Sequence, residues 1–255
     1  MAEAYHEASK LEPALAAAQL APLRRFAGEP ALQRAAARST RRHPLRPALP
    51  LPVPVWPAAT LEDAVLRRRS TAELGGGELT LADLSLVLAG ATGCTGPVVG
   101  PDGTPLAGRA APSGGGLYPL ELIVVPLRCP ALDQVAYRYD PERNALEPMP
   151  AGTHPGSLDD LLYQPEITAS AGALVVVVAT FSRTRIKYGL RGYRFALLEA
   201  GHIVHGALLA AAAAELRAVP LGGLVERRLE RRLALDGVRE SIVYAFALGR
   251  PGGAP

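Results

Sequence analysis

The chain has 255 residues, of which 49% are hydrophobic and 20% charged, and this composition excludes a disordered protein and fits one folded domain with a short extension. The net charge of +3 comes without interleaved aromatic residues in its arginine runs, which disfavours nucleic-acid binding. The two cysteines lack metal-binding spacing and the apolar run GALVVVVATF is too short to cross a bilayer, so we expect a cytoplasmic protein with no nucleic-acid or membrane partner.

Residues 1–57 are predicted to form an extension that precedes the main domain. About the first 38 residues are rich in alanine and carry charges at helical spacing. Residues 39–57 have proline at every second or third position, which is typical of an extended strap or linker. The main domain is predicted over residues 58–255.

Two short helices begin with the same local pattern. Thr60 is followed three residues later by Asp63, and Thr80 is followed in the same way by Asp83. This spacing predicts a capping box, in which each threonine and aspartate satisfies the other's backbone N–H group. The second helix is expected to stop at Gly93.

The remaining elements follow in chain order. A glycine- and proline-rich loop is predicted over residues 95–116, followed by a strand in LELIVVPL and a hairpin in QVAYRYDPERNALEPM. ALVVVVATF is predicted as a central strand, residues 191–217 as a long helix, and SIVYAFALG as the last strand. Strands and helices alternate without a regular βαβ period, which favours an α+β fold over a doubly wound sheet.

The stretch LRRRSTAEL places Arg67, Arg68 and Arg69 directly before Ser70. Guanidinium groups donate paired hydrogen bonds and a serine hydroxyl adds another, so this combination suits a phosphate. A solvated basic helix end is the alternative interpretation.

Two glycine-rich stretches could let backbone amides approach a flat or anionic ligand. In RAAPSGGGLYPLE the candidates are Pro112, Ser113, Gly114 and Gly115, and in VPLGGLVERRL they are Gly222 and Gly223. An ordinary loop before a strand and a simple turn remain the alternatives.

The stretch EAGHIVH carries Glu199, His202 and His205 at three-residue spacing. Zinc motifs on helices space their histidines by four residues, so we predict no metal site and favour packed core histidines.

Lys187 and Tyr188 are neighbours just before the long helix, with Arg191 and Arg194 one and two turns further on. An ammonium near a phenol lowers the phenol's pKa, which would make Tyr188 usable for proton transfer. The alternative is an exposed lysine beside a tyrosine that anchors the corner.

In this order, RRRS, APSGGGLYPLE, IKYGLRGYRFALLEAGH, PLGGL and ALGRP resemble the flavin-dependent nitroreductase-like superfamily. They are more closely similar to its SagB-type dehydrogenase branch, the McbC-like azoline oxidases of ribosomal peptide biosynthesis. The resemblance implies an α+β fold with a mostly antiparallel sheet and a homodimer with two FMN sites at the subunit interface. It also implies an azoline-containing peptide substrate, molecular oxygen as electron acceptor and a separate cyclodehydratase partner.

The resemblance also assigns residues. Arg68, Arg69 and Ser70 would hold the FMN phosphate and ribityl chain, with Arg250 returning to the phosphate, and the other contacts would come from Pro112, Ser113, Gly114, Gly115, Gly222 and Gly223. The branch often has an arginine where this chain has Ala72, so the clamp could depend more on Arg67.

Lys187 and Tyr188 match the catalytic pair of the branch, and our hypothesis makes Tyr188 the base or proton relay and Lys187 the residue that tunes its pKa. Arg191 and Tyr193 are expected to contact the substrate, and Arg194 to face the peptide backbone or a second subunit. A nitro- or enone-reductase of the same fold and a flavin-free scaffold subunit are the alternative functions.

Overall fold

The computed structural model describes residues 2–10, 16–37, 47–99, 105–153 and 156–252. The part of the predicted proline strap at residues 39–46 lies outside these ranges, whereas residues 51–57 run without helix or strand, as expected for an extended segment.

A mostly antiparallel sheet forms the centre of the molecule, in the strand order β1-β7-β6-β5-β8-β10-β2, with β9 pairing to β10. Its strands are β1 (Leu49–Pro50), β2 (Gly76–Gly77), β5 (Leu120–Pro126), β6 (Tyr137–Asp140), β7 (Ala145–Pro148), β8 (Ala173–Ala179), β9 (Arg217–Leu221) and β10 (Ser241–Pro251). The α+β fold expected from the sequence is confirmed.

Both faces of the sheet are buried, and β8 shows why its sequence is uniformly apolar. Val175 and Val177 point into one hydrophobic core, whereas Val176 and Val178 point into the other. All seven residues of this strand are buried. A strand covered on both faces has no polar alternation, as observed here.

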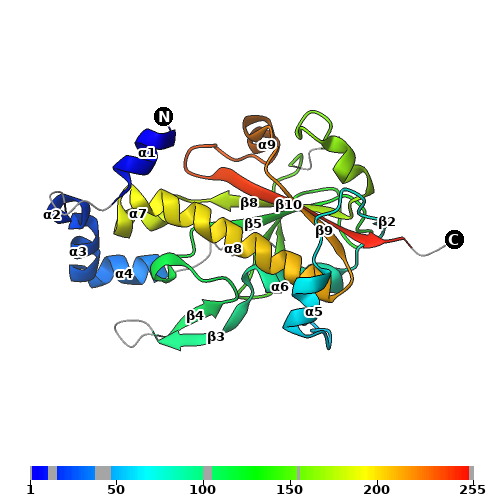
Figure 1. Ribbon diagram of the computed structural model, residues 1–255, viewed down its shortest axis with the longest axis horizontal. Helices are drawn as coiled ribbons and strands as arrows, with labels where there is room; N and C mark the ends of the chain where they lie inside the picture. Colours follow the sequence, from blue (N-terminus) through cyan, green and yellow to red (C-terminus); the bar gives the residue numbers. More distant parts are fainter. Residues whose placement is uncertain (1, 11–15, 38–46, 100–104, 154–155, 253–255) are drawn as a thin grey trace.

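Helices cover the two faces unequally (Figure 1). α6 (Leu81–Thr92) and the 23-residue α8 (Arg191–Ala213) contribute to the first core, whereas α9 (Glu226–Arg232) and the 3-10 helix η3 (Pro165–Ser170) contribute to the second. α6 and α8 approach so closely that a Cβ atom built on Gly206 would lie only 2.5 Å from the carbonyl oxygen of Gly90. Small residues are therefore required at this crossing.

By length and hydropathy, α8 could cross a membrane, but half of its apolar window is buried inside the protein. Its contacts with α6 and with the sheet account for that burial. The core position of α8 therefore explains its apolar composition.

The two ends of α8 meet different parts of the chain. α5 (Leu61–Arg67) lies at the C-terminal end, and α7 (Ser182–Tyr188) precedes the N-terminal end (Figure 1). The N-terminal helices are α1 (Ala2–Ala8), α2 (Ala16–Gln19), α3 (Ala21–Gly28) and α4 (Pro30–Ala37), and α3 packs against α7.

Both predicted capping boxes are present, at Thr60 with Asp63 and at Thr80 with Asp83.

Two other expectations are wrong. The predicted loop over 95–116 contains a hairpin of β3 (Cys94–Val99) and β4 (Pro105–Arg109), since the pairing of the two segments outweighs their glycine and proline content. The long helix ends at Ala213 rather than at 217, and the chain then turns into β9.

Candidate functional site

Arg67, Arg68 and Arg69 line a cavity of about 400 Å³, as the sequence suggested for an anion site. Arg217, at the start of β9, lines the same cavity, and its contribution was not predicted. Four guanidinium groups against the carboxylates of Glu73 and Glu215 leave this cavity cationic. A basic cavity of this kind suits a phosphate group.

The end of α5 fixes this arginine cluster. The Nη1 atom of Arg69 donates to the carbonyl oxygens of Leu66 at 2.6 Å and Arg68 at 2.9 Å. Nη1 of Arg68 lies 3.4 Å from the Ser70 Oγ atom, and Ser70 forms a parallel bridge with Ala218 of β9. The helix end and the strand therefore hold the arginine and serine groups together.

The glycine-rich loop meets the lysine-tyrosine pair. Gly115 has a φ of 66°, and a Cβ atom built on it would lie 2.5 Å from Lys187 Nζ and 2.6 Å from Tyr188 Oη. Only glycine fits both this backbone conformation and this approach without strain. The structure thus brings together two stretches that are more than 70 residues apart in the chain.

The buried carboxyl group of Glu199 holds this loop through hydrogen bonds. Glu199 of α8 is 3% exposed and forms hydrogen bonds with the Ser113 hydroxyl and with the Gly114 backbone. Burial raises the pKa of Glu199 to about 7, although these hydrogen bonds and the charges of Arg109 and Arg183 oppose the shift. The sequence showed Glu199 only as part of a weak metal pattern, so its role in the loop was missed.

The predicted electrostatics of the pair are wrong in direction. Burial raises the pKa of the Tyr188 phenol and lowers the pKa of the Lys187 ammonium. Lys187 Nζ lies 5.3 Å from the Tyr188 ring centroid and 5.0 Å from the Phe26 ring centroid. Loss of water around both groups outweighs their mutual effect, so the Lys187 ammonium gives up its proton more readily than in water and the Tyr188 phenol less readily.

Gly222 and Gly223 are exposed and directly follow β9, the strand that begins at the arginine cavity. Arg250 does not line that cavity. Its guanidinium forms an ion pair with Asp83 in the capping box of α6, with Nε of Arg250 3.2 Å from Asp83 Oδ2. Pro112 and Gly115 are exposed at the glycine-rich loop.

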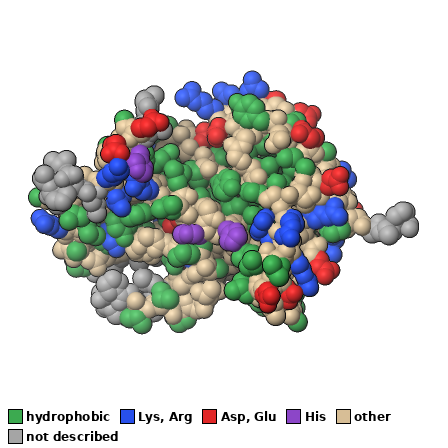
Figure 2. Space-filling model, viewed as in Figure 1, with side chains coloured by type: hydrophobic (Ala, Val, Ile, Leu, Met, Phe, Trp, Pro, Cys, Tyr) green, Lys and Arg blue, Asp and Glu red, His purple; other side chains and the backbone are tan. Residues whose placement is uncertain are grey.

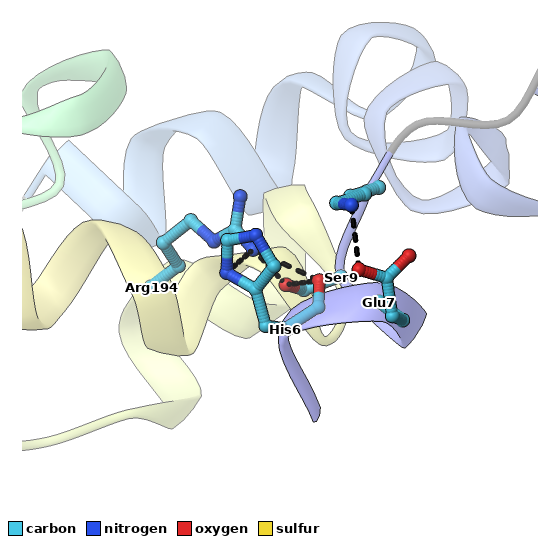
Figure 3. A network of polar contacts seen from close by, with 5 residues as sticks. His6, Glu7, Ser9 and Arg194 are labelled. Atoms are coloured by element: carbon cyan, nitrogen blue, oxygen red, sulfur yellow. Dashed lines mark hydrogen bonds and ion pairs between the residues drawn. The ribbon is translucent and has the colours of Figure 1, made fainter. Parts of the chain in front are cut away.

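Arg191, Tyr193 and Arg194 contact the chain's own N-terminal segment. Arg191 Nη1 donates to the Ser9 carbonyl oxygen at 2.8 Å, and the Tyr193 ring packs edge-on against Tyr5 with the centroids 5.2 Å apart. Figure 3 shows Arg194 directed at His6 and Ser9. Within this chain these three side chains therefore contact the N-terminal segment. Their expected contacts with substrate or a second subunit stay predictions.

The arginine cavity and the glycine-rich loop lie at opposite ends of α8. Leu208 and Ala212 line the cavity, whereas Gly114 packs against Phe195. With a helical rise of 1.5 Å per residue, these points are about 20–25 Å apart along the helix. Figure 2 shows basic side chains gathered near α5, at the cavity end of this face.

The histidines of α8 do not form a metal site. His202 and His205 are exposed, which corrects the expectation of core histidines. Among the described residues, no group of three or more histidine, cysteine, aspartate or glutamate side chains could hold a metal ion.

The sequence model of the Nitroreductase family matches residues 65–250. A provisionally named nitroreductase from Methanocaldococcus jannaschii is 28% identical over 190 residues, which cover 74% of this chain and 90% of that protein. The crystal structure of a provisionally named nitroreductase from Ralstonia eutropha is 26% identical, with a TM-score of 0.62, over 85% of this chain and 95% of that chain. The E. coli microcin synthetase McbBCD complex, solved with truncated pro-MccB17 bound, has the same fold at 19% identity and a TM-score of 0.57, over 97% and 91%.

Proposed function

The chain belongs to the nitroreductase family, and from this premise we propose that it is an FMN-dependent dehydrogenase of the SagB type. Its proposed reaction oxidises thiazoline and oxazoline rings of a ribosomally made peptide to thiazoles and oxazoles. The observation that carries the proposal is the approach of Lys187 and Tyr188 to Gly115. Gly115 belongs to PSGGGLYP and the pair to KYGLRGYR, the two motifs on which the resemblance to the branch rests, and a Cβ atom at Gly115 would meet both side chains within 2.6 Å.

The residues fit FMN. A cavity of about 400 Å³ lined by Arg67, Arg68, Arg69 and Arg217 suits the phosphate, and the exposed Gly115, which has no side chain, lets a flat ring approach the backbone of the loop. A phosphate group and a flat aromatic ring are the two chemically distinct ends of FMN. We therefore propose that the arginines hold the phosphate and that the loop faces the isoalloxazine.

We further propose that each flavin site is shared by two copies of the chain. The arginine cavity and the loop are about 20–25 Å apart along α8, which is farther than one FMN molecule reaches. Two chains related by a two-fold axis could place the cavity of one beside the loop of the other. The exposed apolar side chains on α5 and α8, among them Val65, Leu66 and Leu198, support such an interface.

Azoline oxidation removes one proton from Cα and one hydride from the adjacent ring carbon, so the ring loses two electrons. FMN, when bound, supplies the hydride acceptor, and molecular oxygen is the proposed final electron acceptor. Lys187 is the proposed proton acceptor, because its lowered pKa increases the fraction of neutral amine. Tyr188 keeps its hydroxyl proton and is proposed to orient the ring and to relay the proton.

The first experiment measures the cofactor and the product together. The purified protein is expected to be yellow and to convert a thiazoline peptide to a product lighter by about 2 Da, the mass of the hydride and proton removed. Lys187→Ala and Tyr188→Phe are expected to lose azole formation and keep FMN. Loss of FMN in both variants would instead make the pair structural, and a colourless protein that binds no added FMN would favour a scaffold subunit.

The second experiment tests the shared site by mixing two inactive variants. Arg68→Ala damages the arginine cavity, and Tyr188→Phe damages the other half of the site. If the site is shared, mixed dimers contain one intact site of two, and random assembly restores about a quarter of the wild-type activity. If both halves come from one chain, the mixture stays inactive.

A second candidate function is the reduction of nitro compounds, because the Methanocaldococcus and Ralstonia relatives are named as nitroreductases. Rapid NAD(P)H oxidation with a nitroaromatic compound, without azole formation, would favour it. A cyclodehydratase partner is also proposed, since the fold occurs in a synthetase complex that holds a pro-peptide. Co-purification with such an enzyme from the producing cell would test that part.

A further inference from the structure

A second cavity, of about 530 Å³, lies between the N-terminal segment and the lysine-tyrosine pair. One wall consists of Lys187, Tyr188, Leu190 and Phe195, together with neighbouring residues of α7 and α8. Its volume is in the range of ordinary ligand sites. A ligand group in this cavity could therefore reach Lys187 and Tyr188 from the side of the N-terminal segment.

The opposite wall comes from α1, α2 and α3. It is formed mainly by apolar side chains, and these are Ala8, Ala18, Leu20, Pro22 and Leu23. Residues 2–37 precede the part of the chain that matches the family, which begins at residue 65. This wall therefore lies outside the part of the chain that the family model matches, although the McbBCD structure covers 97% of this chain.

The N-terminal segment is docked at both ends. At α1, Arg194 Nη2 donates to the His6 carbonyl oxygen at 3.0 Å and also contacts Ser9 (Figure 3). At α3, Phe26 is 8% exposed and its ring faces Lys187 Nζ. Two separate anchors hold the second wall in position without filling the cavity between them.

The charges of the cavity are one-sided. Lys10, Lys187 and Arg191 line it, and the described lining includes no carboxylate. Lys10 pairs with Glu7 at 2.6 Å, but no described carboxylate pairs with Lys187. An apolar cavity with cationic groups accepts aliphatic or aromatic side chains and repels lysine and arginine.

We propose that this cavity is a specificity site for the peptide substrate, and that it binds the apolar side chain of a residue next to the reacting ring. The inference rests on the proposed function, because it takes the substrate to be a peptide. Consecutive Cα atoms are about 3.8 Å apart, so a ring beside Lys187 and Tyr188 brings its neighbour's side chain to the cavity. The extension therefore selects the substrate, and the family domain carries the redox chemistry.

The test uses thiazoline peptides that differ only in the residue beside the ring, which is leucine, glycine or lysine, on each side in turn. Wild-type kcat/KM is expected to be about tenfold or more higher for leucine than for glycine on one side, as burial of a leucine side chain predicts. The lysine peptide is expected to be poorer than the glycine peptide. Equal values for leucine and glycine on both sides would overturn the proposal.

Two matched variants locate the effect. Ala18→Trp fills the cavity from an exposed position of α2 and is expected to remove the preference for leucine over glycine, measured as the ratio of the two kcat/KM values. Ala17→Trp adds the same side chain at an exposed neighbouring position that does not line the cavity, and it is expected to keep the preference. Loss of the preference in both variants would assign it to docking of the segment rather than to the cavity.

A binding measurement separates this proposal from the proposed function. Calorimetry with the corresponding thiazole peptides measures affinity without turnover, and the wild type is expected to bind the leucine peptide more tightly than the glycine peptide. Binding selectivity that Ala18→Trp abolishes, without any azoline oxidation, would keep the cavity and refute the reaction. Oxidation without selectivity would keep the reaction and refute the cavity, and the absence of both would refute both.

Discussion

Replacement of Glu199 by glutamine is expected to change how the stability of the protein depends on pH. Burial raises the pKa of Glu199 from its ordinary 4.5 to about 7. Between these two pH values the folded state binds more protons than the unfolded state, so stability falls as pH rises through this window. Below pH 4.5 both states are protonated and the effect vanishes.

The size of the effect follows from the same two values. A difference of about 2.5 pKa units corresponds to about 3 kcal/mol, at 1.36 kcal/mol per unit. Glutamine has nearly the same shape, still accepts the hydrogen bonds of the loop, and carries no charge at any of these pH values. Any cost of its buried amide group is independent of pH. Relative to the wild type, Glu199→Gln should therefore gain about 2–3 kcal/mol between pH 5 and pH 8.

Urea unfolding followed by circular dichroism at pH 5, 6, 7 and 8 measures this difference. Glu62→Gln, an exposed substitution on α5, serves as the control for exchanging a carboxyl for an amide group at the surface. A Glu199→Gln curve that runs parallel to the wild-type curve, within about 0.5 kcal/mol, would refute the raised pKa of Glu199.

Three further substitutions test individual contacts. Gly115→Ala is expected to lower azoline oxidation about tenfold or more, because its Cβ atom displaces the lysine-tyrosine pair. Gly116→Ala is the control, since Gly116 has the same positive φ but a Cβ atom there meets no neighbour. Equal losses in a kcat assay would contradict the clash. Gly206→Ala, at the α6–α8 crossing, should lower the free energy of unfolding by about 1–3 kcal/mol in urea. Gly201→Ala, in open space on the same helix, should not lower it. The reverse order would argue against close packing at the crossing. Asp83→Ala should lower the free energy of unfolding by about 1–2 kcal/mol through loss of the α6 cap, and an unchanged unfolding midpoint would show that the cap is dispensable.

Local patterns explain which parts of the fold could be predicted from the sequence. The capping boxes at Thr60 and Thr80 depend on residues three positions apart, so the sequence contains all that is needed. The β3–β4 hairpin depends instead on pairing between two segments with poor strand propensity, such as Pro97 with Ala107. Composition alone cannot reveal such pairing.

The candidate site divides in the same way. The resemblance assigned Gly115 to the flavin loop and Lys187 and Tyr188 to catalysis, but the close approach of these three residues was not predicted. The role of Glu199 was missed, because its burial and its hydrogen bond to Ser113 arise only in the folded chain. The contact of Arg194 with His6 spans 188 positions, and no local pattern signals it.

The length of α8 also sets the separation between the two halves of the candidate site. One end of the helix lies at the arginine cavity and the other at the glycine-rich loop, so the number of residues between Phe195 and Leu208 sets the distance between the two halves. Insertion of four residues, about one turn, would lengthen this distance by about 6 Å with little change in which face is buried. In the proposed dimer, such an insertion would alter the geometry of both flavin sites at once. Loop lengths in this chain can therefore vary more freely than the length of α8.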